Sequence, residues 1–275
     1  MVESWNPKVG VVGAGTMGAG IAQVAAQAGL PVVLIDQADE WVERGMGAIA
    51  DGLERLVAKT TLSVEERDAV LARIKVGTGY DLLTGCEFVV EAVNERFDIK
   101  TEVFQRIAEV DGEEAVIASN TSSISITALA AKVPRPERVA GMHFFNPVPV
   151  LPLVEVVRGV QTSEETLARV RSLAERMGKT PVDVADAPGF VANRVLMPMI
   201  NEAIFCLSEG VAAAEAIDQV MKLGMAHPMG PLALADLIGL DVCLDILATL
   251  QRDLGEDKYR PAPLLRRLVA AGRLG

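Results

Sequence analysis

A glycine-rich turn near the N-terminus constrains the fold of this chain more than any other feature. The turn, Gly13-Ala-Gly15-Thr-Met-Gly18, follows an apolar run at 8–12 and precedes an alanine-rich run, and a second apolar run ends at Asp36. This order predicts a strand, a tight turn, a helix and a second strand. The three glycines suit a turn whose backbone approaches a phosphate closely and whose helix packs tightly on a sheet. The sequence therefore predicts a Rossmann-like unit that binds a dinucleotide, although the motif alone also occurs as a simple turn in other α/β folds.

Asp36 indicates which dinucleotide is bound. It lies 18 residues beyond Gly18, where an acidic side chain accepts hydrogen bonds from both hydroxyl groups of the adenosine ribose. The same carboxylate would repel a 2′-phosphate, so we expect NAD rather than NADP. The pyrophosphate should lie at the N-terminus of the helix, where free N–H groups and the helix dipole favour an anion. The expected cofactor-binding residues of this segment are Gly13, Gly15, Thr16, Met17, Gly18 and Asp36.

Strand and helix signals alternate through the first two thirds of the chain. Short β-branched runs lie at 8–12, 32–35, 87–93, 115–119, 138–144, 153–157 and 180–184. Helical stretches separate most of them, at 16–28, 40–58, 64–74, 98–109, 124–131 and 163–177. This alternation is typical of a mostly parallel sheet with helices on both faces. The two helices within 40–74 exceed what a simple crossover needs, so we expect them to form a helical-hairpin insertion.

The character of the sequence changes at Pro188. The helical stretches beyond it are 190–209, 213–223, 232–254 and 262–271, and the segment ADAPG before it reads as a linker. The expected fold class is therefore α/β, with an N-terminal Rossmann-like sheet and a C-terminal all-helical domain. We expect an NAD-binding domain at 1–185 and a helical substrate and dimerisation domain at 186–275.

Composition excludes several classes of function. Asp and Glu outnumber Lys and Arg by 37 to 26, giving a net charge of −11, and such a surface repels nucleic acid and anionic lipid. The uncharged stretch at 9–35 is long enough for a membrane helix, but its six glycines and Pro31 fit a strand–turn–helix–strand unit better. Three separated cysteines and two histidines provide no zinc-like cluster. We therefore expect a soluble cytoplasmic protein with reduced thiols, no metal and neither nucleic-acid nor membrane partners.

A histidine and a glutamate on neighbouring strands form the candidate catalytic pair. His143 ends one apolar run, and Glu155 interrupts the next, where an unpartnered carboxylate would be costly. If the two runs pair as antiparallel strands about Pro149, residues whose numbers sum to 298 face each other, and His143 faces Glu155. A carboxylate opposite an imidazole fixes its tautomer and suits a general base acting on a hydroxyl group. The alternative is a buried structural ion pair.

The segment SNTSS at 119–123 places short hydroxyl and amide side chains at the end of a strand. Ligands of open α/β sheets bind at this carboxyl edge. The same residues could instead serve only as the N-cap of the helix expected at 124–131.

Six motifs together resemble one family. They are VGVVGAGTMGAGIA at 9–22, FVVEAVNE at 88–95, ASNTSSI at 118–124, GMHFFNPVPVLPLVEVV at 141–157, DAPGFVANR at 186–194 and HPMGPLALAD at 227–236. In this order they resemble the 3-hydroxyacyl-CoA dehydrogenases, most closely the bacterial 3-hydroxybutyryl-CoA dehydrogenases among them. The resemblance implies oxidation of a short-chain (S)-3-hydroxyacyl-CoA to the 3-ketoacyl-CoA, with hydride transfer to NAD.

The resemblance also implies roles for single residues. His143 matches the general base and Glu155 its orienting partner, while Ser122 matches a serine that contacts substrate and nicotinamide. Asn193 matches an asparagine of the second domain that completes the site. Four further positions match ligand contacts: Glu95, Lys100 and Asn146 for the cofactor, and Lys59 for a phosphate of CoA. An exposed helix lysine such as Lys59 is, however, commonly just solvated.

Two features of the family lie outside the residues matched so far. Its members are typically homodimers through the helical domain, so we expect a homodimer here. They usually continue beyond the equivalent of Gly275 into a tail with a cofactor-contacting lysine, a contact to which no residue of this sequence is assigned.

Two other functions compete with this interpretation. Dehydrogenases of free 3-hydroxy acids share the glycine-rich start, but use a lysine early in the helical domain, and none lies between Lys179 and Lys222. A non-catalytic NAD-binding protein, like the lens crystallin related to this family, would not need Ser122, His143, Glu155 and Asn193 together.

Overall fold

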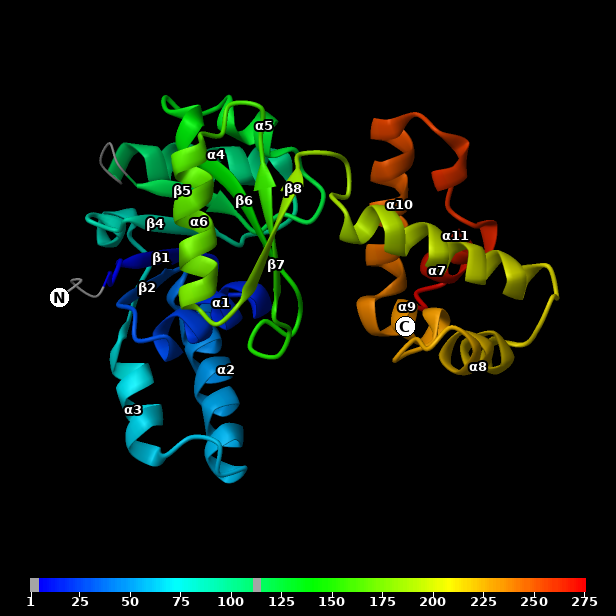
Figure 1. Cartoon of the computed structure of the whole chain (residues 1–275), viewed down its shortest axis with the longest axis horizontal. Helices are drawn as coiled ribbons and strands as arrows, with labels where there is room; N and C mark the ends of the chain where they lie inside the picture. Colours follow the sequence, from blue (N-terminus) through cyan, green and yellow to red (C-terminus); the bar gives the residue numbers. More distant parts are fainter. Residues whose placement is uncertain (1–4, 111–114) are drawn as a thin grey trace. The chain divides into compact units, whose positions relative to one another are not determined.

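An eight-stranded sheet forms the centre of the N-terminal part of the molecule (Figure 1). The computed structural model describes residues 5–110 and 115–275. The strands are β1 (Val9–Val12), β2 (Val32–Ile35), β3 (Ile74–Gly77), β4 (Phe88–Glu91), β5 (Val116–Ser119), β6 (Val139–Phe144), β7 (Leu153–Arg158) and β8 (Thr180–Ala185), in the spatial order β3-β2-β1-β4-β5-β6-β7-β8. Neighbours from β3 to β6 are parallel, β7 is antiparallel to β6, and β8 is parallel to β7. The prediction of a mostly parallel Rossmann-like sheet is confirmed.

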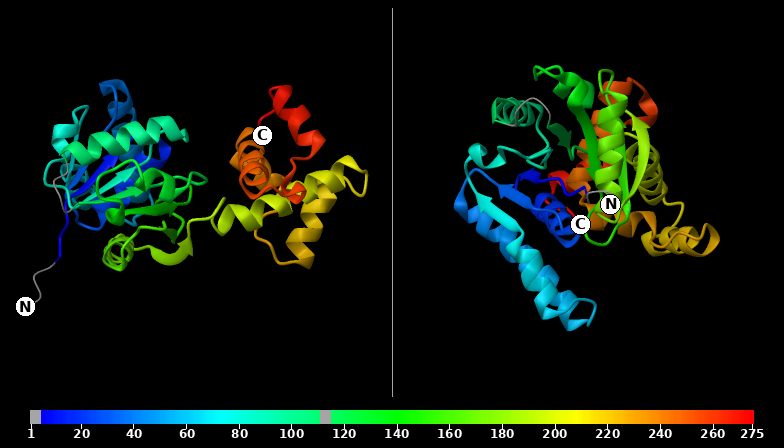
Figure 2. Two further views of the ribbon diagram at one scale, coloured as in Figure 1. Left: turned by 90° about the horizontal axis from the view of Figure 1, so that it is seen from above. Right: turned by 60° about the vertical axis from the view of Figure 1, so that its left-hand side comes forward.

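Helices cover both faces of this sheet. They are α1 (Thr16–Gln27), α2 (Asp39–Ala58), α3 (Val64–Ala72), α4 (Phe97–Val110), α5 (Ile126–Ala130) and α6 (Glu164–Arg176), with short 3-10 turns at Tyr80–Leu83 and Pro136–Arg138. Side chains of α1 and α6 share one apolar core with the strands, while α4 lies on the opposite face from α6 (Figure 2, left). The central strands β1, β2 and β4 are buried on both sides, which is why they read as nearly continuous apolar runs in the sequence.

The paired helices α2 and α3 project beyond the sheet as a hairpin (Figure 2, right). The buried residues of α2 recur at helical spacing, so one face of the helix packs inward. A capping box starts α3: Glu66 N–H donates to Ser63 Oγ, and Ser63 N–H donates to the Glu66 carboxylate. The predicted helical-hairpin insertion is confirmed.

Strand β3 was not predicted, because the sequence suggests a helix as far as residue 74. The helix α3 ends at Ala72, and Ile74–Gly77 pairs with β2 at the edge of the sheet. Only Ile74 of this strand is buried, so the segment lacks the apolar run by which its neighbours are recognised.

The sheet-containing unit ends at Asp186, one residue beyond the boundary expected from the sequence. Asp186 accepts hydrogen bonds from Ser125 Oγ (2.7 Å), Ile126 N (3.1 Å) and Thr127 N (2.8 Å). Its own N–H donates to the carbonyl oxygen of Arg158 (2.9 Å). The carboxylate therefore supplies acceptors to the first turn of α5, which has no other source for them within the helix.

The second unit, Ala187–Gly275, is all-helical and is fully described by the structure. Its helices are α7 (Ala192–Ser208), α8 (Ala214–Gly224), α9 (Pro231–Ile238), α10 (Leu240–Leu254) and α11 (Pro263–Ala270), with a 3-10 turn at Asp257–Tyr259. The prediction of a single helix at 232–254 is wrong, because Gly239 adopts φ 104° and separates α9 from α10. Apolar side chains of α7, α9, α10 and α11 form the core of this unit. No helix within the described ranges, in either unit, has the length and apolarity needed to cross a bilayer.

Candidate active site

The glycine-rich turn between β1 and α1 has the geometry that close approach of a ligand requires. Gly13 adopts φ 103°, and a Cβ there would lie 2.6 Å from the carbonyl oxygen of Ala92. A Cβ on Gly18 would lie 1.7 Å from the carbonyl oxygen of Gly13, so no side chain fits between turn and helix. A Cβ on Gly15 would meet no atom within 4 Å. The turn is thus tightly packed on its inner side and open where a pyrophosphate would approach.

The carboxylate of Asp36 is fixed beside this turn. Its Oδ2 accepts from Ala14 N (2.7 Å), and its Oδ1 accepts from Gln37 N (2.7 Å). Thr16 and Met17 begin α1, and the amide groups of a first helical turn have no acceptors within the helix. Open space at the turn, a helix N-terminus and a fixed carboxylate fit a dinucleotide with free ribose hydroxyl groups.

His143 and Glu155 face each other across β6 and β7, as the predicted register requires. Nδ1 of His143 lies 2.8 Å from Oε2 of Glu155, and both residues are buried. An ionised carboxylate only accepts, so Nδ1 donates its proton to Glu155 and the lone pair of the imidazole is on Nε2. The ring of Phe145 packs against the imidazole, with 4.6 Å between centroids. The pair can therefore hold an imidazole in the tautomer that accepts a proton at Nε2.

The end of β6 is also tied to the loop that follows β5. The N–H of Phe144 donates to Oδ1 of Asn120 (2.9 Å), and the N–H of Asn120 donates to the carbonyl oxygen of Glu91 (2.8 Å). Asn120 is the second residue of SNTSS, and its function in fixing the strand that carries His143 was not predicted.

The remaining residues of that loop surround Glu95. Oε1 of Glu95 accepts from Thr121 Oγ1 (2.6 Å), Ser122 N (2.9 Å) and Ser123 N (3.1 Å), and from both serine hydroxyl groups at 3.1–3.3 Å. Burial by itself would raise the pKa of Glu95, but the charge of Lys100 and these hydrogen bonds outweigh it and lower the pKa. Ser122 and Glu95, which the sequence places in the site separately, are therefore in direct contact.

Lys100 is a buried lysine beside Glu95. Its side chain is 1% exposed, and its Nζ lies 2.7 Å from Oε1 of Glu91 and 3.3 Å from Oε2 of Glu95. Glu91 also accepts from Ser119 Oγ (2.6 Å) and Val93 N (2.7 Å). The ammonium group of Lys100 is thus held between two carboxylates, and one of them is the predicted site residue Glu95. Glu91 was not predicted, although a carboxylate ending the apolar strand FVVE is the signal that could have identified it.

The remaining predicted residues are Lys59, Asn146 and Asn193, which lie on three different elements. Lys59 is exposed at the C-terminal end of α2. Asn146 is exposed in the loop after β6, three residues beyond His143. Asn193 is the second residue of α7 in the helical unit.

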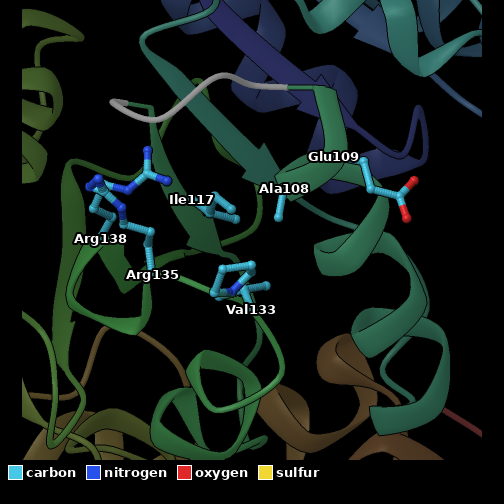
Figure 3. A pocket seen from close by; sticks show the side chains of 7 residues that line it. Ala108, Glu109, Ile117, Val133, Arg135 and Arg138 are labelled. Atoms are coloured by element: carbon cyan, nitrogen blue, oxygen red, sulfur yellow. The ribbon is translucent and has the colours of Figure 1, made fainter.

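A cavity of about 400 Å³ lies between α4 and the segment that leads into β6 (Figure 3). Its lining residues are Ala108, Glu109, Ile117, Val133, Pro134, Arg135 and Arg138. None of the predicted site residues lines it, so its position does not coincide with the His143–Glu155 pair. Across residues 5–110 and 115–275, no group of three or more His, Cys, Asp or Glu side chains could hold a metal ion.

Comparison with known proteins identifies the family. The family model described as the NAD-binding domain of 3-hydroxyacyl-CoA dehydrogenase matches residues 8–187, and the model of the C-terminal domain matches residues 189–275. The chain belongs to the 3-hydroxyacyl-CoA dehydrogenase family. Its sheet-containing unit is the NAD-binding domain of that family, and the chain is an NAD-dependent oxidoreductase.

Individual members of the 3-hydroxyacyl-CoA dehydrogenase family match over nearly their whole length. A probable 3-hydroxybutyryl-CoA dehydrogenase of Deinococcus radiodurans is 55% identical, with 98% of this chain and 96% of that protein covered. The 3-hydroxybutyryl-CoA dehydrogenase of Bradyrhizobium diazoefficiens is 48% identical, with coverage of 98% and 92%. The crystal structure of (S)-3-hydroxybutyryl-CoA dehydrogenase from Ralstonia eutropha superimposes with a TM-score of 0.95 at 52% identity, covering 98% of this chain and 95% of that one. These matches favour a 3-hydroxyacyl-CoA dehydrogenase over a free 3-hydroxy acid dehydrogenase or a non-catalytic protein.

Proposed function

We propose that this chain oxidises a short-chain (S)-3-hydroxyacyl-CoA, such as 3-hydroxybutyryl-CoA, to the 3-ketoacyl-CoA. The observation that carries the proposal is the buried contact between His143 and Glu155 at the end of β6. The names of the most similar relatives support the substrate class and its short acyl chain.

The proposed chemistry follows from the tautomer of His143. Nε2 accepts the proton of the substrate hydroxyl group, and the imidazolium that forms is stabilised by the carboxylate of Glu155 at 2.8 Å. Bound NAD supplies the acceptor for the hydride that leaves C3. In the reverse direction the protonated His143 donates to the ketone oxygen.

The other predicted residues bind and orient in this proposal. Ser122 and Asn193 hydrogen-bond the substrate oxygen atoms, which holds C3 in a reactive position. Glu95, Lys100 and Asn146 contact the cofactor, and Lys100 also pairs with Glu95.

Two further ligand contacts complete the proposed binding site. Asp36 and the glycine turn from Gly13 to Gly18 hold the adenosine half of the cofactor. Lys59 pairs with a phosphate of CoA from the exposed end of α2.

Turnover assays test the proposed reaction directly. NADH oxidation is measured with acetoacetyl-CoA and with longer 3-ketoacyl-CoA thioesters, and each measurement is repeated with NADPH. The proposal expects fastest turnover with acetoacetyl-CoA and NADH. The substitution His143→Gln should lower kcat by about 10³-fold, because a positioned general acid or base contributes that order of rate, while NADH affinity barely changes. Near-normal turnover by that variant would refute the assignment of His143.

We also propose that the protein is a homodimer through its helical unit. Large apolar side chains on and next to the packed helices α8 and α9 are strongly exposed: Val220 (61%), Leu223 (76%), Met225 (61%) and Leu237 (70%). Exposed apolar surface of this kind is typical of contacts between subunits.

Light scattering distinguishes a dimer from the 29.2 kDa chain. The double substitution Leu223→Glu and Leu237→Glu should yield the monomer mass, because it places charge in the apolar surface. Val160→Glu is the matched control, since Val160 is 86% exposed but lies in the sheet-containing unit. A monomer mass for the unaltered protein would exclude the dimer.

The proposed location is the cytoplasm. The three cysteines are unpaired, and burial raises the pKa of the Cys86 and Cys243 thiols to about 11. Unpaired cysteines are typical of proteins in a reducing compartment.

A further inference from the structure

A buried lysine lies where α6 ends and β8 begins. Gly178 adopts φ 72° and stops the helix, and the N–H of Lys179 donates to the carbonyl oxygen of Ala174 (2.9 Å). This turn directs the side chain of Lys179 inward, where the residue is only 7% exposed. Burial lowers the pKa of Lys179 below its ordinary value of 10.5. An ammonium group in such a position needs good acceptors, because its burial is costly.

The acceptors of Lys179 are backbone atoms of one loop. Its Nζ donates to the carbonyl oxygen of Val148 in a short hydrogen bond and to that of Leu151 at 2.9 Å. This loop, residues 145–152, connects β6 to β7. Next to the lysine, the N–H of Thr180 donates to the carbonyl oxygen of Pro152 (2.7 Å), so Lys179 and the first residue of β8 both bind the loop.

The side chain of the same residue, Val148, contacts the cofactor-binding helix α1. The side chain of Val148 is 2% exposed, and a Cβ on Gly20 of α1 would lie 2.8 Å from the Cβ of Val148. The absence of a side chain at Gly20 therefore allows the loop to pack directly on the helix. The loop is held by α1 and by Lys179.

The same loop joins the two strands of the catalytic pair. His143 lies two residues before it and Glu155 three residues after it, and Asn146 is its second residue. The loop therefore links α1 to both strands of the catalytic pair.

We propose that Lys179 is a positioning residue that holds the 145–152 loop against α1 and thereby aligns the His143–Glu155 strands with the cofactor-binding helix. The inference rests on the proposed function for its kinetic consequence but not for its structural one. Lys179 does not touch the reacting atoms; it acts through the carbonyl groups of Val148 and Leu151.

The test compares Lys179→Met with a matched control in the full-length chain. Lys75→Met is the control, because Lys75 is an exposed lysine on β3, at the opposite edge of the same sheet. When the ammonium group of Lys179 is removed, the amide hydrogens of the 145–152 loop should exchange faster. The amides of Val150 and Leu151, which donate to the Pro147 carbonyl, report this exchange. We also expect the Kd for NADH to rise and kcat to fall by about tenfold each, since misplacing bound groups costs rate and affinity together. Lys75→Met should leave all three quantities unchanged.

Two more variants make the outcome decisive. Lys179→Arg keeps the charge and the donors, so it should recover part of the NADH affinity and of the protection of the loop. Gly20→Ala pushes Val148 from α1 and should reproduce the increase in Kd for NADH, without adding fully to Lys179→Met in the double variant.

The inference is overturned if Lys179→Met lowers stability but leaves loop exchange, NADH affinity and kcat at the unaltered values. Should Lys179→Met not fold, normal NADH affinity in Gly20→Ala overturns it instead. Hydrogen exchange and NADH titration need no turnover, so absence of activity with acetoacetyl-CoA would refute the proposed function while leaving this test intact.

Discussion

The substitution Glu155→Gln examines the chemistry of the site with the least change in shape. Glutamine keeps an oxygen that can accept from Nδ1 of His143, so the hydrogen bond across β6 and β7 is retained. The negative charge is removed from a position 2.8 Å from that nitrogen. Because both side chains are less than one tenth exposed, solvent cannot replace the missing charge.

The expected loss follows from the distance between the charges. A contact of 2.8 Å between Nδ1 and Oε2 places the two delocalised charges about 4 Å apart. At an effective dielectric constant of about 20, two unit charges at that distance attract by about 4 kcal/mol. The imidazolium exists only when the proton has been taken, so this attraction is lost mainly from the transition state. At about 1.4 kcal/mol for each factor of ten, kcat should fall by about 10³-fold.

Steady-state kinetics with (S)-3-hydroxybutyryl-CoA and NAD measure this loss, because the imidazolium forms during the reaction only in the oxidation direction, and urea unfolding measures stability. The free energy of unfolding should fall by no more than about 1.5 kcal/mol, because the buried hydrogen bond remains. Glu164→Gln is the matched control: Glu164 is 76% exposed and pairs with Arg158 on the surface, so kcat should stay within about twofold. A kcat for Glu155→Gln close to that of the control, or a fall in stability large enough to unfold the protein, would show that the pair is only structural.

Two further predictions concern the cofactor edge. Asp36→Asn should weaken NADH binding by about 2 kcal/mol, or about 30-fold, because hydrogen bonds to a charged acceptor are lost. Fluorescence titrations with NADH and NADPH should show a smaller preference for NADH. An unchanged ratio of the two Kd values would contradict the assigned function of Asp36. Burial of Glu95 raises its pKa, but Lys100 and the loop hydrogen bonds outweigh burial and lower it below 4.5. The ionised group therefore stabilises the fold above pH 4.5, and this contribution is lost as the pH falls through the lowered folded-state pKa. At neutral pH, urea unfolding should accordingly give a lower free energy of unfolding for Glu95→Gln than for the unaltered protein, and this difference should shrink in acid. A difference in the free energy of unfolding that does not depend on pH would exclude this explanation.

The sheet could be predicted where strands are buried on both faces or end in a distinctive polar residue. The pairing of His143 with Glu155 followed from one turn position and the two-residue period of strands, and the structure confirms it. β3 escaped prediction because an edge strand with one buried residue carries little apolar signal. The interruption at Gly239 was not predicted, because a glycine inside a helical pattern is usually tolerated. Only the φ of 104° at Gly239 shows that the helix ends there.

The candidate site was predicted as a set of separate residues rather than as a network. Lys100 was expected at the cofactor, and the structure adds that its ammonium group pairs with both Glu91 and Glu95. Glu91 lies at the end of β4, next to Ser119 at the end of β5, and only the packing of neighbouring strands brings them together. Sequence spacing gives no direct information about such contacts, because they depend on the order of strands in the sheet.

The carboxylate of Asp186 determines where the nucleotide-binding unit can be cut from the rest of the chain. It accepts from Ser125, Ile126 and Thr127 at the start of α5, although it follows the last strand and reads as part of a linker. A fragment that stops at Ala185 would retain every strand yet leave these donors without their acceptor, next to the loop that carries Ser122. A fragment that retains Asp186 keeps that end of α5 intact, so one residue separates a truncation that preserves the loop from one that loosens it.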